Sequence, residues 1–274
     1  MGISLDPGRA GGKPPLRIVP GWRMVGTMTG PSPLLLFAGT TEARLLGDAL
    51  AGMPLRAQAI VTEPPRGHMA MQIAQDLRRF GGVNDLVLFL RTGGYRAIVD
   101  ASHGFDGDTT RIGYAAARAL GLPHLRLARP VWNVDENPRW QAARDVVAAM
   151  ARVPPGARVF SATGWDSLPD YAGFPGAKLL LRQTRGETRP MPYAFVEPVF
   201  GVPPFTKRSE VQLFEEMGVD LLICRNLGGQ ASRPKLDAAT RLGLDVILID
   251  PPEPPQGMQT VHEVEAAADW VRSL

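Results

Sequence analysis

The chain is poor in cysteine, because Cys224 is the single one among its 274 residues. One thiol excludes an internal disulfide and every metal site made of several cysteines, and it is typical of a protein of the reducing cytoplasm. Cys224 ends an apolar run, where a free cysteine is usually buried and inert. The four histidines form no pair three or four residues apart, so we expect no metal site.

Long apolar runs and an excess charge of one sign are also missing. No apolar segment reaches the roughly 20 residues that cross a bilayer, so we expect no membrane partner. The formal net charge is only +3, and the basic residues are scattered, so no nucleic-acid partner is indicated despite a pI near 9.3. An anionic small molecule suits the mild positive excess better. The absence of a G-x-S-x-G segment argues against a serine hydrolase of that kind.

What the chain does contain is a repeat. Residues 99–123 and 221–245 follow one plan, and their helix-ending glycines, Gly121 and Gly243, lie 122 positions apart. Each copy predicts an apolar strand, a polar loop, an Ala-rich helix stopped by glycine, and a second strand. Such units build parallel sheets, whose ligands lie beyond the carboxyl ends of the strands. The sequence therefore predicts an α/β fold with two Rossmann-like parallel-sheet domains facing a central cleft.

The chain divides into four expected segments. Its length favours two domains of ordinary size, and Val153-Pro154-Pro155-Gly156 is the most persuasive linker between them. The first residues are rich in Gly, Pro and basic side chains, with Met24 or Met28 as an alternative start. The expected segments are a disordered leader at 1–30, a first α/β domain at 31–152, a second at 153–257, and a C-terminal helix at 258–274 that can return to the first domain.

Periodicity and turn residues predict the remaining elements. Helices are expected over 41–50, 69–80, 85–90, 139–151, 209–217 with Ser209 as N-cap, and 262–274. Strands are expected over 34–37, 57–61, 97–101, 124–127, 179–182, 193–198 and 246–249. The segment 158–164 repeats the strand and turn of 34–40, which extends the duplication.

The first candidate site follows the first strand. Gly39-Thr40-Thr41-Glu42 lies between a buried strand and a helix, where free backbone N–H groups and the helix dipole favour a phosphate. This segment is not the G-x-G-x-x-G fingerprint, and an ordinary turn capped by threonine is an equal alternative.

Two further candidate sites are the matching loops of the repeat. His103, in Asp100-Ala101-Ser102-His103, ends a central strand and can bind a substrate carboxylate or act as a general acid, or it is merely solvated. Arg225-Asn226-Leu227-Gly228-Gly229 is its counterpart, with a cation, an amide and two glycines that suit an anionic or amide-bearing ligand, or else a tight turn. Thr163-Gly164 forms a turn that suits ligand contact better than a nucleophile.

These segments occur in a fixed order along the chain. They are Gly39-Thr40-Thr41-Glu42-Ala43-Arg44, Asp100-Ala101-Ser102-His103-Gly104-Phe105-Asp106, Arg129-Pro130-Val131-Trp132, Thr163-Gly164, Arg225-Asn226-Leu227-Gly228-Gly229 and Lys235-Leu236-Asp237-Ala238-Ala239. In this order they resemble the motifs of the precorrin-6A reductase family of cobalamin biosynthesis. The likeness runs from about Leu34 to Trp270.

The resemblance implies a cytoplasmic two-domain enzyme that uses NADPH to reduce one double bond of the precorrin-6A macrocycle, giving precorrin-6B. It implies that the cofactor is bound by Gly39, Thr40, Thr41, Glu42, Ala43 and Arg44. It implies that the substrate is bound by Ser102, His103, Thr163, Gly164, Arg225, Asn226, Gly228 and Gly229, with His103 as the candidate catalytic residue. The tetrapyrrole is then the expected partner of a monomeric chain.

The chain departs from the family pattern beside its candidate sites. Gly104, Asp106 and Leu227 stand where the family has Pro, Ala and Ser, and Arg225 stands where it has Lys. Arg keeps the charge with a different geometry. The departures leave three alternatives open: a diverged, non-catalytic nucleotide- or tetrapyrrole-binding paralogue, a cobalt-precorrin-6A reductase, and an NAD(P)-dependent reductase of another acidic substrate.

Overall fold

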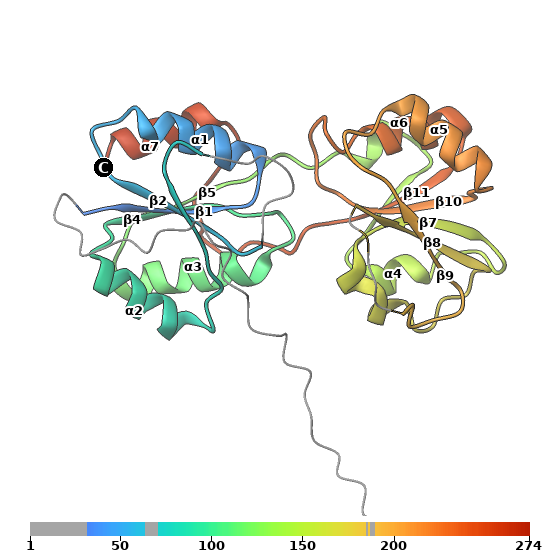
Figure 1. The fold of residues 1–274 in the computed structure, drawn as a ribbon, viewed down its shortest axis with the longest axis horizontal. Coiled ribbons are helices and arrows are strands. Elements are labelled where there is room, and N and C mark those ends of the chain that lie inside the picture. The colour runs from blue at the N-terminus through green and yellow to red at the C-terminus, as the bar shows by residue number, and fades with distance from the viewer. Residues whose placement is uncertain (1–31, 64–70, 185, 187–189) are drawn as a thin grey trace, which may run out of the picture. The chain divides into compact units, whose positions relative to one another are not determined.

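The structure is a computed structural model that describes residues 32–63, 71–184, 186 and 190–274. The predicted leader at 1–30 lies outside these residues. The described chain forms two six-stranded sheets, and all their strand pairings are parallel (Figure 1). The predicted α/β class with two parallel sheets is therefore confirmed. No helix among the described residues is both long enough and apolar enough to span a membrane.

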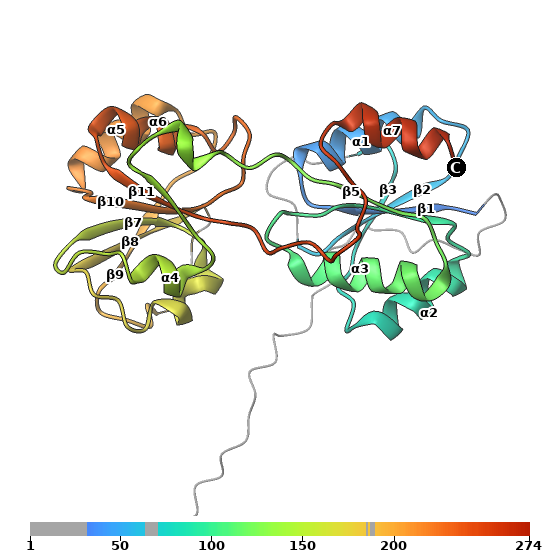
Figure 2. The same ribbon diagram turned by 180° about the vertical axis from the view of Figure 1, so that it is seen from behind.

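The first sheet has the strand order β12-β5-β4-β1-β2-β3. Its strands are β1 (Leu34–Ala38), β2 (Ala57–Val61), β3 (Ala74–Leu77), β4 (Ala97–Ala101), β5 (His124–Leu127) and β12 (Thr260–Val261). Helices cover both faces: α1 (Thr41–Ala51) and α7 (Val264–Arg272) lie side by side on one, and α2 (Val83–Gly93) and α3 (Gly107–Leu120) lie on the other (Figures 1 and 2).

Coverage of both faces explains why the central strands are apolar along their whole length. In β1, Leu34 and Leu36 belong to the core beneath α1 and α7, whereas Leu35 and Phe37 belong to the core beneath α2 and α3. Successive side chains of a strand point to opposite faces, so one short apolar run supplies both cores.

The second sheet has the order β6-β11-β10-β7-β8-β9. Its strands are β6 (Trp140–Ala143), β7 (Arg158–Ala162), β8 (Lys178–Gln183), β9 (Val196–Phe200), β10 (Leu221–Arg225) and β11 (Asp245–Ile249). One face carries α5 (Lys207–Glu216) and α6 (Pro234–Leu242). The other carries α4 (Val146–Met150) and the 3-10 helix η2 (Trp165–Tyr171), and a second 3-10 helix, η1 (Val134–Glu136), precedes β6.

The predicted duplication is confirmed element by element. β4-α3-β5 and β10-α6-β11 occupy equivalent places in the two sheets. Both helices end at a glycine in the left-handed region, Gly121 with φ 65° and Gly243 with φ 67°, where a side chain would be strained.

The second sheet is formed by one continuous segment, residues 140–249, whereas the first sheet is completed by a strand and a helix from the end of the chain. β6 and α4 come first in the continuous segment, and β6 pairs with β11. β12 and α7 come last in the chain and return to the first sheet, where β12 pairs with β5 and α7 enters the first core. The predicted return of the C-terminal helix is therefore confirmed.

The chain consequently crosses between the sheets twice, at residues 128–139 and at residues 250–259. We propose that the domain boundaries follow these two crossovers instead of the expected break between 152 and 153. The predicted linker Val153-Pro154-Pro155-Gly156 connects α4 to β7, and both of these elements belong to the second sheet or its cover.

Two predicted helices are wrong in part or in whole. Within 139–151, residues 140–143 form strand β6 and only 146–150 are helical, because β11 supplies backbone partners that outweigh the helix propensity of alanine. Within 69–80, the described residues contain strand β3, which pairs with β2.

A smaller correction concerns α5. Its N-cap is Thr206 and not Ser209, which lies at the third helical position. In this capping box the Thr206 hydroxyl accepts from the Ser209 N–H, and the Ser209 hydroxyl accepts from the Thr206 N–H. The periodic signal placed the helix correctly but not its first turn.

Candidate functional site

The loop after β1 is held tightly against the loop after β4. Thr40 caps α1: its hydroxyl accepts a hydrogen bond from the Ala43 N–H and donates one to the Ala101 carbonyl, both at 3.1 Å. A Cβ on Gly39 would lie 2.8 Å from the backbone nitrogen of His103, so only glycine permits this approach. The turn therefore brings the first two candidate sites together.

The N-terminus of α1 retains the features of an anion site. The amide of Thr41 has no acceptor within the helix, as helix geometry requires, and Gly39 and Thr41 are exposed. The Glu42 N–H donates to its own carboxylate. The hydroxyl of Ser102 is buried and has no hydrogen-bond partner among the described residues. A phosphate at this helix end would satisfy the Thr41 amide and the Ser102 hydroxyl and meet the positive end of the helix dipole.

The other residues predicted for the cofactor have partners of their own. Glu42 receives two hydrogen bonds from Arg129, at 2.8 and 2.6 Å. Partial burial acts to raise the pKa of Glu42, but the hydrogen bonds from Arg129, from the Glu42 N–H and from Thr40, together with the charge of Arg129, outweigh it, and the pKa is lowered. Arg44 pairs with Asp48 at 3.0 Å, and Ala43 is fully buried. These side chains support the helix end instead of lining its mouth.

A buried ion pair supports the loop after β4. Asp100 is fully buried, accepts a hydrogen bond from the Ser102 N–H at 3.0 Å, and pairs with the guanidinium of Arg126. Arg126 also donates to the hydroxyl of Thr110 on α3. The carboxylate predicted next to His103 therefore shapes the backbone of the loop and has no contact with solvent.

His103 itself is half-buried. Its Nδ1 accepts a hydrogen bond from the Phe105 N–H at 3.2 Å, and its carbonyl accepts one from the Asp106 N–H at 2.8 Å. Because Nδ1 is an acceptor here, the neutral ring carries its proton on Nε2. Nε2 is therefore the donor atom of the ring.

Phe105 joins the two matching loops of the repeat. Its ring centre lies 6.2 Å from that of His103 and 5.0 Å from the guanidinium carbon of Arg225, and it packs against the core of the second sheet. A Cβ on Gly164 would lie 4.0 Å from the guanidinium of Arg225. The structure thus brings together His103, Gly164 and Arg225 from three strand ends.

Thr163 lies in a buried network of hydroxyl groups. Its hydroxyl oxygen is 2.8 Å from that of Ser161 and 2.6 Å from that of Ser167, and Tyr171 joins the same group. Burial raises the pKa of Tyr171, so its phenol stays neutral. Since Thr163 is 1 % exposed, it supports the turn after β7 and does not present its hydroxyl to a ligand.

The loop after β10 contacts the first crossover. The side-chain amide of Asn226 accepts from the Trp132 N–H at 2.8 Å and donates to the Trp132 carbonyl at 3.0 Å. A Cβ on Gly228 would lie 1.8 Å from the Pro130 carbonyl oxygen, and one on Gly229 would press on Arg129. Three residues predicted for substrate thus hold a segment of this chain.

Sequence reasoning missed Phe105, Arg129 and Lys235 as individual residues of interest. Lys235, in the first turn of α6, donates to the Ser232 carbonyl at 2.7 Å, and its Nζ lies 6.0 Å from the centre of the Trp132 ring. Burial is the main cause that lowers the pKa of Lys235. Each of the three belongs to a segment that carried the family resemblance, which was the available signal.

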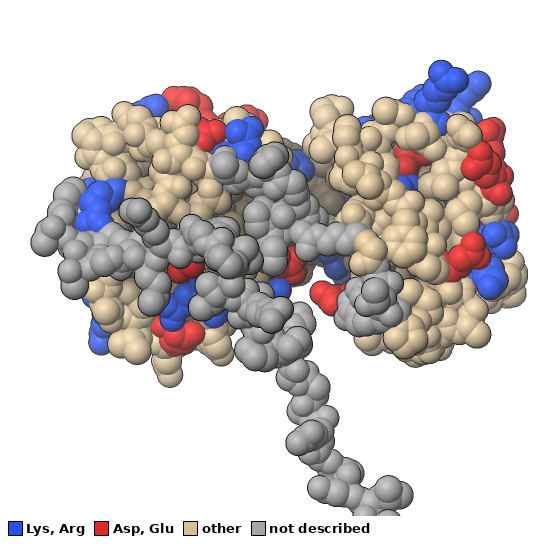
Figure 3. Space-filling model, in the orientation of Figure 1, with Lys and Arg blue, Asp and Glu red and all other residues tan. Residues whose placement is uncertain are grey.

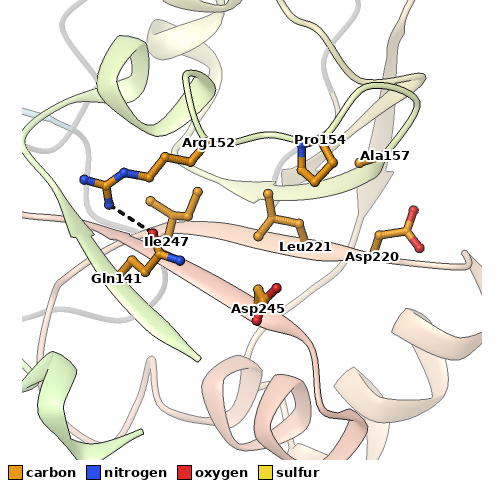
Figure 4. Close-up of a pocket in the computed structure, with 8 residues that line it drawn as sticks. All are labelled: Gln141, Arg152, Pro154, Ala157, Asp220, Leu221, Asp245 and Ile247. Atoms are coloured by element: carbon orange, nitrogen blue, oxygen red, sulfur yellow. Dashed lines mark hydrogen bonds between the residues drawn. The ribbon is translucent and has the colours of Figure 1, made fainter. Parts of the chain in front are cut away.

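A small pocket of about 70 Å³ lies at the amino ends of strands β10 and β11 of the second sheet (Figure 4). It is lined by Gln141, Arg152, Pro154, Ala157, Asp220, Leu221, Asp245 and Ile247. Arg152 crosses it and donates to Gln141 at 3.4 Å. Because ligands of open parallel sheets bind beyond the carboxyl ends of the strands, this pocket is not the candidate site.

Charge on the visible face is mixed. Figure 3 shows basic and acidic side chains interspersed among uncharged ones over the described residues. This face therefore offers no broad basic surface for an anion.

Comparisons with known proteins identify the family and the fold. Residues 33–272 match the family model described as Precorrin-6x reductase CbiJ/CobK. A precorrin-6A reductase of Rhodococcus erythropolis is 32% identical over 88% of this chain and 98% of its own length. A cobalt-precorrin-6A reductase of Priestia megaterium is 27% identical over 80% of this chain and 91% of its own. The solved structure of CobK precorrin-6A reductase superimposes with a TM-score of 0.79 at 31% identity, over 88% of this chain and 97% of that one.

Proposed function

Because the chain belongs to the precorrin-6x reductase CbiJ/CobK family, we propose that it reduces one double bond of precorrin-6A to precorrin-6B with NADPH as the reductant. The observation that carries the proposal is the convergence of strand-end loops on His103, Phe105 and Arg225, beside a helix N-terminus fit for a phosphate. A reductase of this family needs a nicotinamide site and an acidic-ring site next to each other.

The first domain is the proposed holder of the cofactor. When bound, NADPH supplies the hydride. The amide of Thr41 and the unpartnered hydroxyl of Ser102 would hold its phosphates, and the fit is supported by the close turn at Gly39. The side chains of Glu42 and Arg44 are engaged elsewhere, so the backbone does most of this binding.

His103 and Arg225 are the proposed contacts to the acidic ring. Arg225 offers a permanent cation, and His103 offers the Nε2 proton to a substrate carboxylate. The packing of Phe105 between them keeps both side chains on one site and removes water from it. Alignment and exclusion of water are the main contributions of a protein to hydride transfer.

The family departures have structural explanations in this chain. Asp106 caps α3 by accepting from the Thr109 N–H at 3.2 Å, and it accepts from the Thr62 hydroxyl at 2.8 Å. Leu227 packs on the core of the second sheet, and a Cβ on Gly104 would meet open space. None of the three introduces a free charge or a strained backbone, so they give no support to a non-catalytic paralogue.

The test is turnover. Purified protein should oxidise NADPH in the presence of precorrin-6A and release precorrin-6B, detected by loss of NADPH absorbance and by product mass. Parallel reactions with NADH and with cobalt-precorrin-6A decide the cofactor and the metal state of the substrate. A folded preparation that turns over neither macrocycle would contradict the proposal.

We also propose a monomer in a reducing cytoplasm. Cys224 is a free and fully buried thiol, and burial raises its pKa to about 11, so it is suited neither to a disulfide nor to catalysis. Light scattering during size-exclusion chromatography measures the oligomeric state, and a mass of twice 29.6 kDa would contradict the monomer.

A further inference from the structure

The first crossover, residues 128–139, is held from both sides by residues of the loops that form the candidate site. Its first residues leave β5 and pass between the N-terminus of α1 and the loop after β10. The contacts are made by Arg129, Pro130 and Trp132, which are the three defined residues of the Arg-Pro-x-Trp segment.

On the side of the first sheet, the contact is an ion pair. Arg129 makes two hydrogen bonds to Glu42, at 2.8 and 2.6 Å, and the two side chains are 22% and 23% exposed. A paired geometry of this kind fixes orientation as well as distance. Glu42 lies in the first turn of α1, next to the Thr41 amide assigned to the phosphate.

On the side of the second sheet, the contact is a buried amide. Asn226 is 2% exposed and pairs with both the N–H and the carbonyl of Trp132, as a neighbouring strand would. Its Nδ2 also donates to Asp250 at 3.3 Å, where the second crossover begins. The Asn226 side chain therefore contacts both crossovers, and Asn226 directly follows Arg225 in the chain.

Two glycines complete the contact. Gly228 has φ +63° and Gly229 has φ +71°, and side chains there would run into the Pro130 carbonyl and the Arg129 side chain. The guanidinium of Arg129 thus lies between Glu42 of α1, in the first domain, and the backbone of Gly229, in the second. Arg129 therefore contacts both domains.

We propose that Glu42, Arg129, Asn226, Gly228 and Gly229 form a crossover clamp that positions the loop carrying Arg225 against the loop carrying His103 and Phe105. They act as positioning residues and contact neither the cofactor nor the substrate. The inference rests on the proposed function for its catalytic readout. It predicts a geometric role for residues whose charge and loop position otherwise suggest ligand binding.

The first experiment neutralises and then exchanges the ion pair. Glu42→Gln and Arg129→Gln should each lower kcat by about 10- to 100-fold, the cost of misalignment on the order of an ångström, with an unchanged Kd for NADP⁺. The double variant should lose no more than either single one, because both remove the same contact. The exchange Glu42→Arg with Arg129→Glu should recover most of kcat. A raised Kd for NADP⁺ in Glu42→Gln, without recovery in the exchange, would overturn the clamp in favour of cofactor binding.

A second readout does not depend on turnover. Spin labels on Leu88→Cys in α2 and Val147→Cys in α4, two exposed positions, report the distance between the domains, while buried Cys224 stays unlabelled. The distance distribution should broaden in Glu42→Gln and narrow again in the exchange. Glu265→Gln, the same substitution at an ion pair with Arg272 inside α7, should leave it unchanged.

The two readouts separate the clamp from the proposed function. If the unaltered protein reduces no precorrin, the proposed function fails, and the label distances still decide the clamp. If the label distances are the same in Glu42→Gln, the exchange and the unaltered protein, the clamp is overturned whatever the activity.

Discussion

The role of Asp106 can be assigned only from its neighbours in the structure. Beside His103 in the sequence it resembles an added charge in an anion site, yet in the structure it caps α3 and binds Thr62 at the end of β2. Its carboxylate therefore has three donors within the first domain. At the scale of the residue, hydrogen-bond partners and not sequence neighbours decide function.

We expect Asp106→Ala to lower the free energy of unfolding by about 1–2 kcal/mol, the usual cost of losing an N-cap, without raising reductase activity. Urea denaturation measures the change. Asp108→Ala is the matched control, because Asp108 is an exposed carboxylate in the same first turn. A gain of turnover in Asp106→Ala would instead support the paralogue that lost activity through this carboxylate.

The Glu42 pair should also give stability a pH dependence. The pKa of Glu42 in the folded protein lies below its ordinary value of 4.5, so the unfolded chain binds the proton first as the pH falls. The stabilisation is then fully present above that ordinary value and is lost as the pH falls below it toward the folded pKa. Urea titrations of the protein and of Glu42→Gln at several pH values should converge in acid. A difference that persists unchanged in acid would contradict this assignment.

The connecting segments carry more of the specific contacts than their lack of regular structure suggests. The first crossover binds Glu42 on α1 and Asn226 after β10, and the second begins at Asp250 and passes Tyr114 of α3. Gly228 and Gly229 leave the space that the first crossover occupies, because side chains there would collide with it. At the scale of the element, the loop after β10 is built to receive a crossover.

We expect Gly228→Ala to destabilise the protein more than Gly243→Ala. Both positions have a left-handed backbone, with φ +63° and φ +67°, which costs about 1–2 kcal/mol for alanine. Only at Gly228 does the new Cβ meet the Pro130 carbonyl, since nothing lies within 4 Å at Gly243, and such overpacking adds about 1–3 kcal/mol. Thermal and urea unfolding of the two variants measure the difference. Equal losses would mean that the crossover shifts freely.

The whole molecule contains two similar sheets, and the first of them takes an edge strand, β12, and a helix, α7, from the end of the chain. The buried face of α7, with Ala267, Ala268 and Val271, belongs to the first core. The last residues of the chain therefore stabilise the domain formed by its beginning. Two crossovers of this kind also restrict how far the loops of the candidate site can move apart.

We expect Ala268→Asp to destabilise the first domain selectively, by about 3 kcal/mol or more, because it buries an unpaired charge. Hydrogen exchange should accelerate in β1 and β4 before it does in β7 and β10. Ala266→Asp, on the exposed side of the same helix, should change stability by no more than about 0.5 kcal/mol. Faster exchange that begins in the second sheet would contradict the assignment of α7 to the first core.

Local patterns predicted most of the elements. The strands at 57–61 and 97–101 and the helix-ending glycines Gly121 and Gly243 occur as expected, because buried parallel strands are apolar throughout and glycine accepts the left-handed backbone. The errors at 69–80 and 139–151 are short edge strands, β3 and β6. An edge strand is stabilised by pairing with a neighbouring strand, and its own short sequence does not show which segment that partner will be.

The sequence by itself determined the α/β class, the duplication and the loops that matter, since these follow from periodicity, from glycine and from ordered motifs. Only the tertiary structure decided what those loops do: Thr163 is buried, Asn226 holds Trp132, and Phe105 joins His103 to Arg225. The reason is physical. A side chain's partners are set by strand pairing and by crossovers that bring together residues about a hundred positions apart. A short stretch of sequence does not show which of these distant residues become its neighbours.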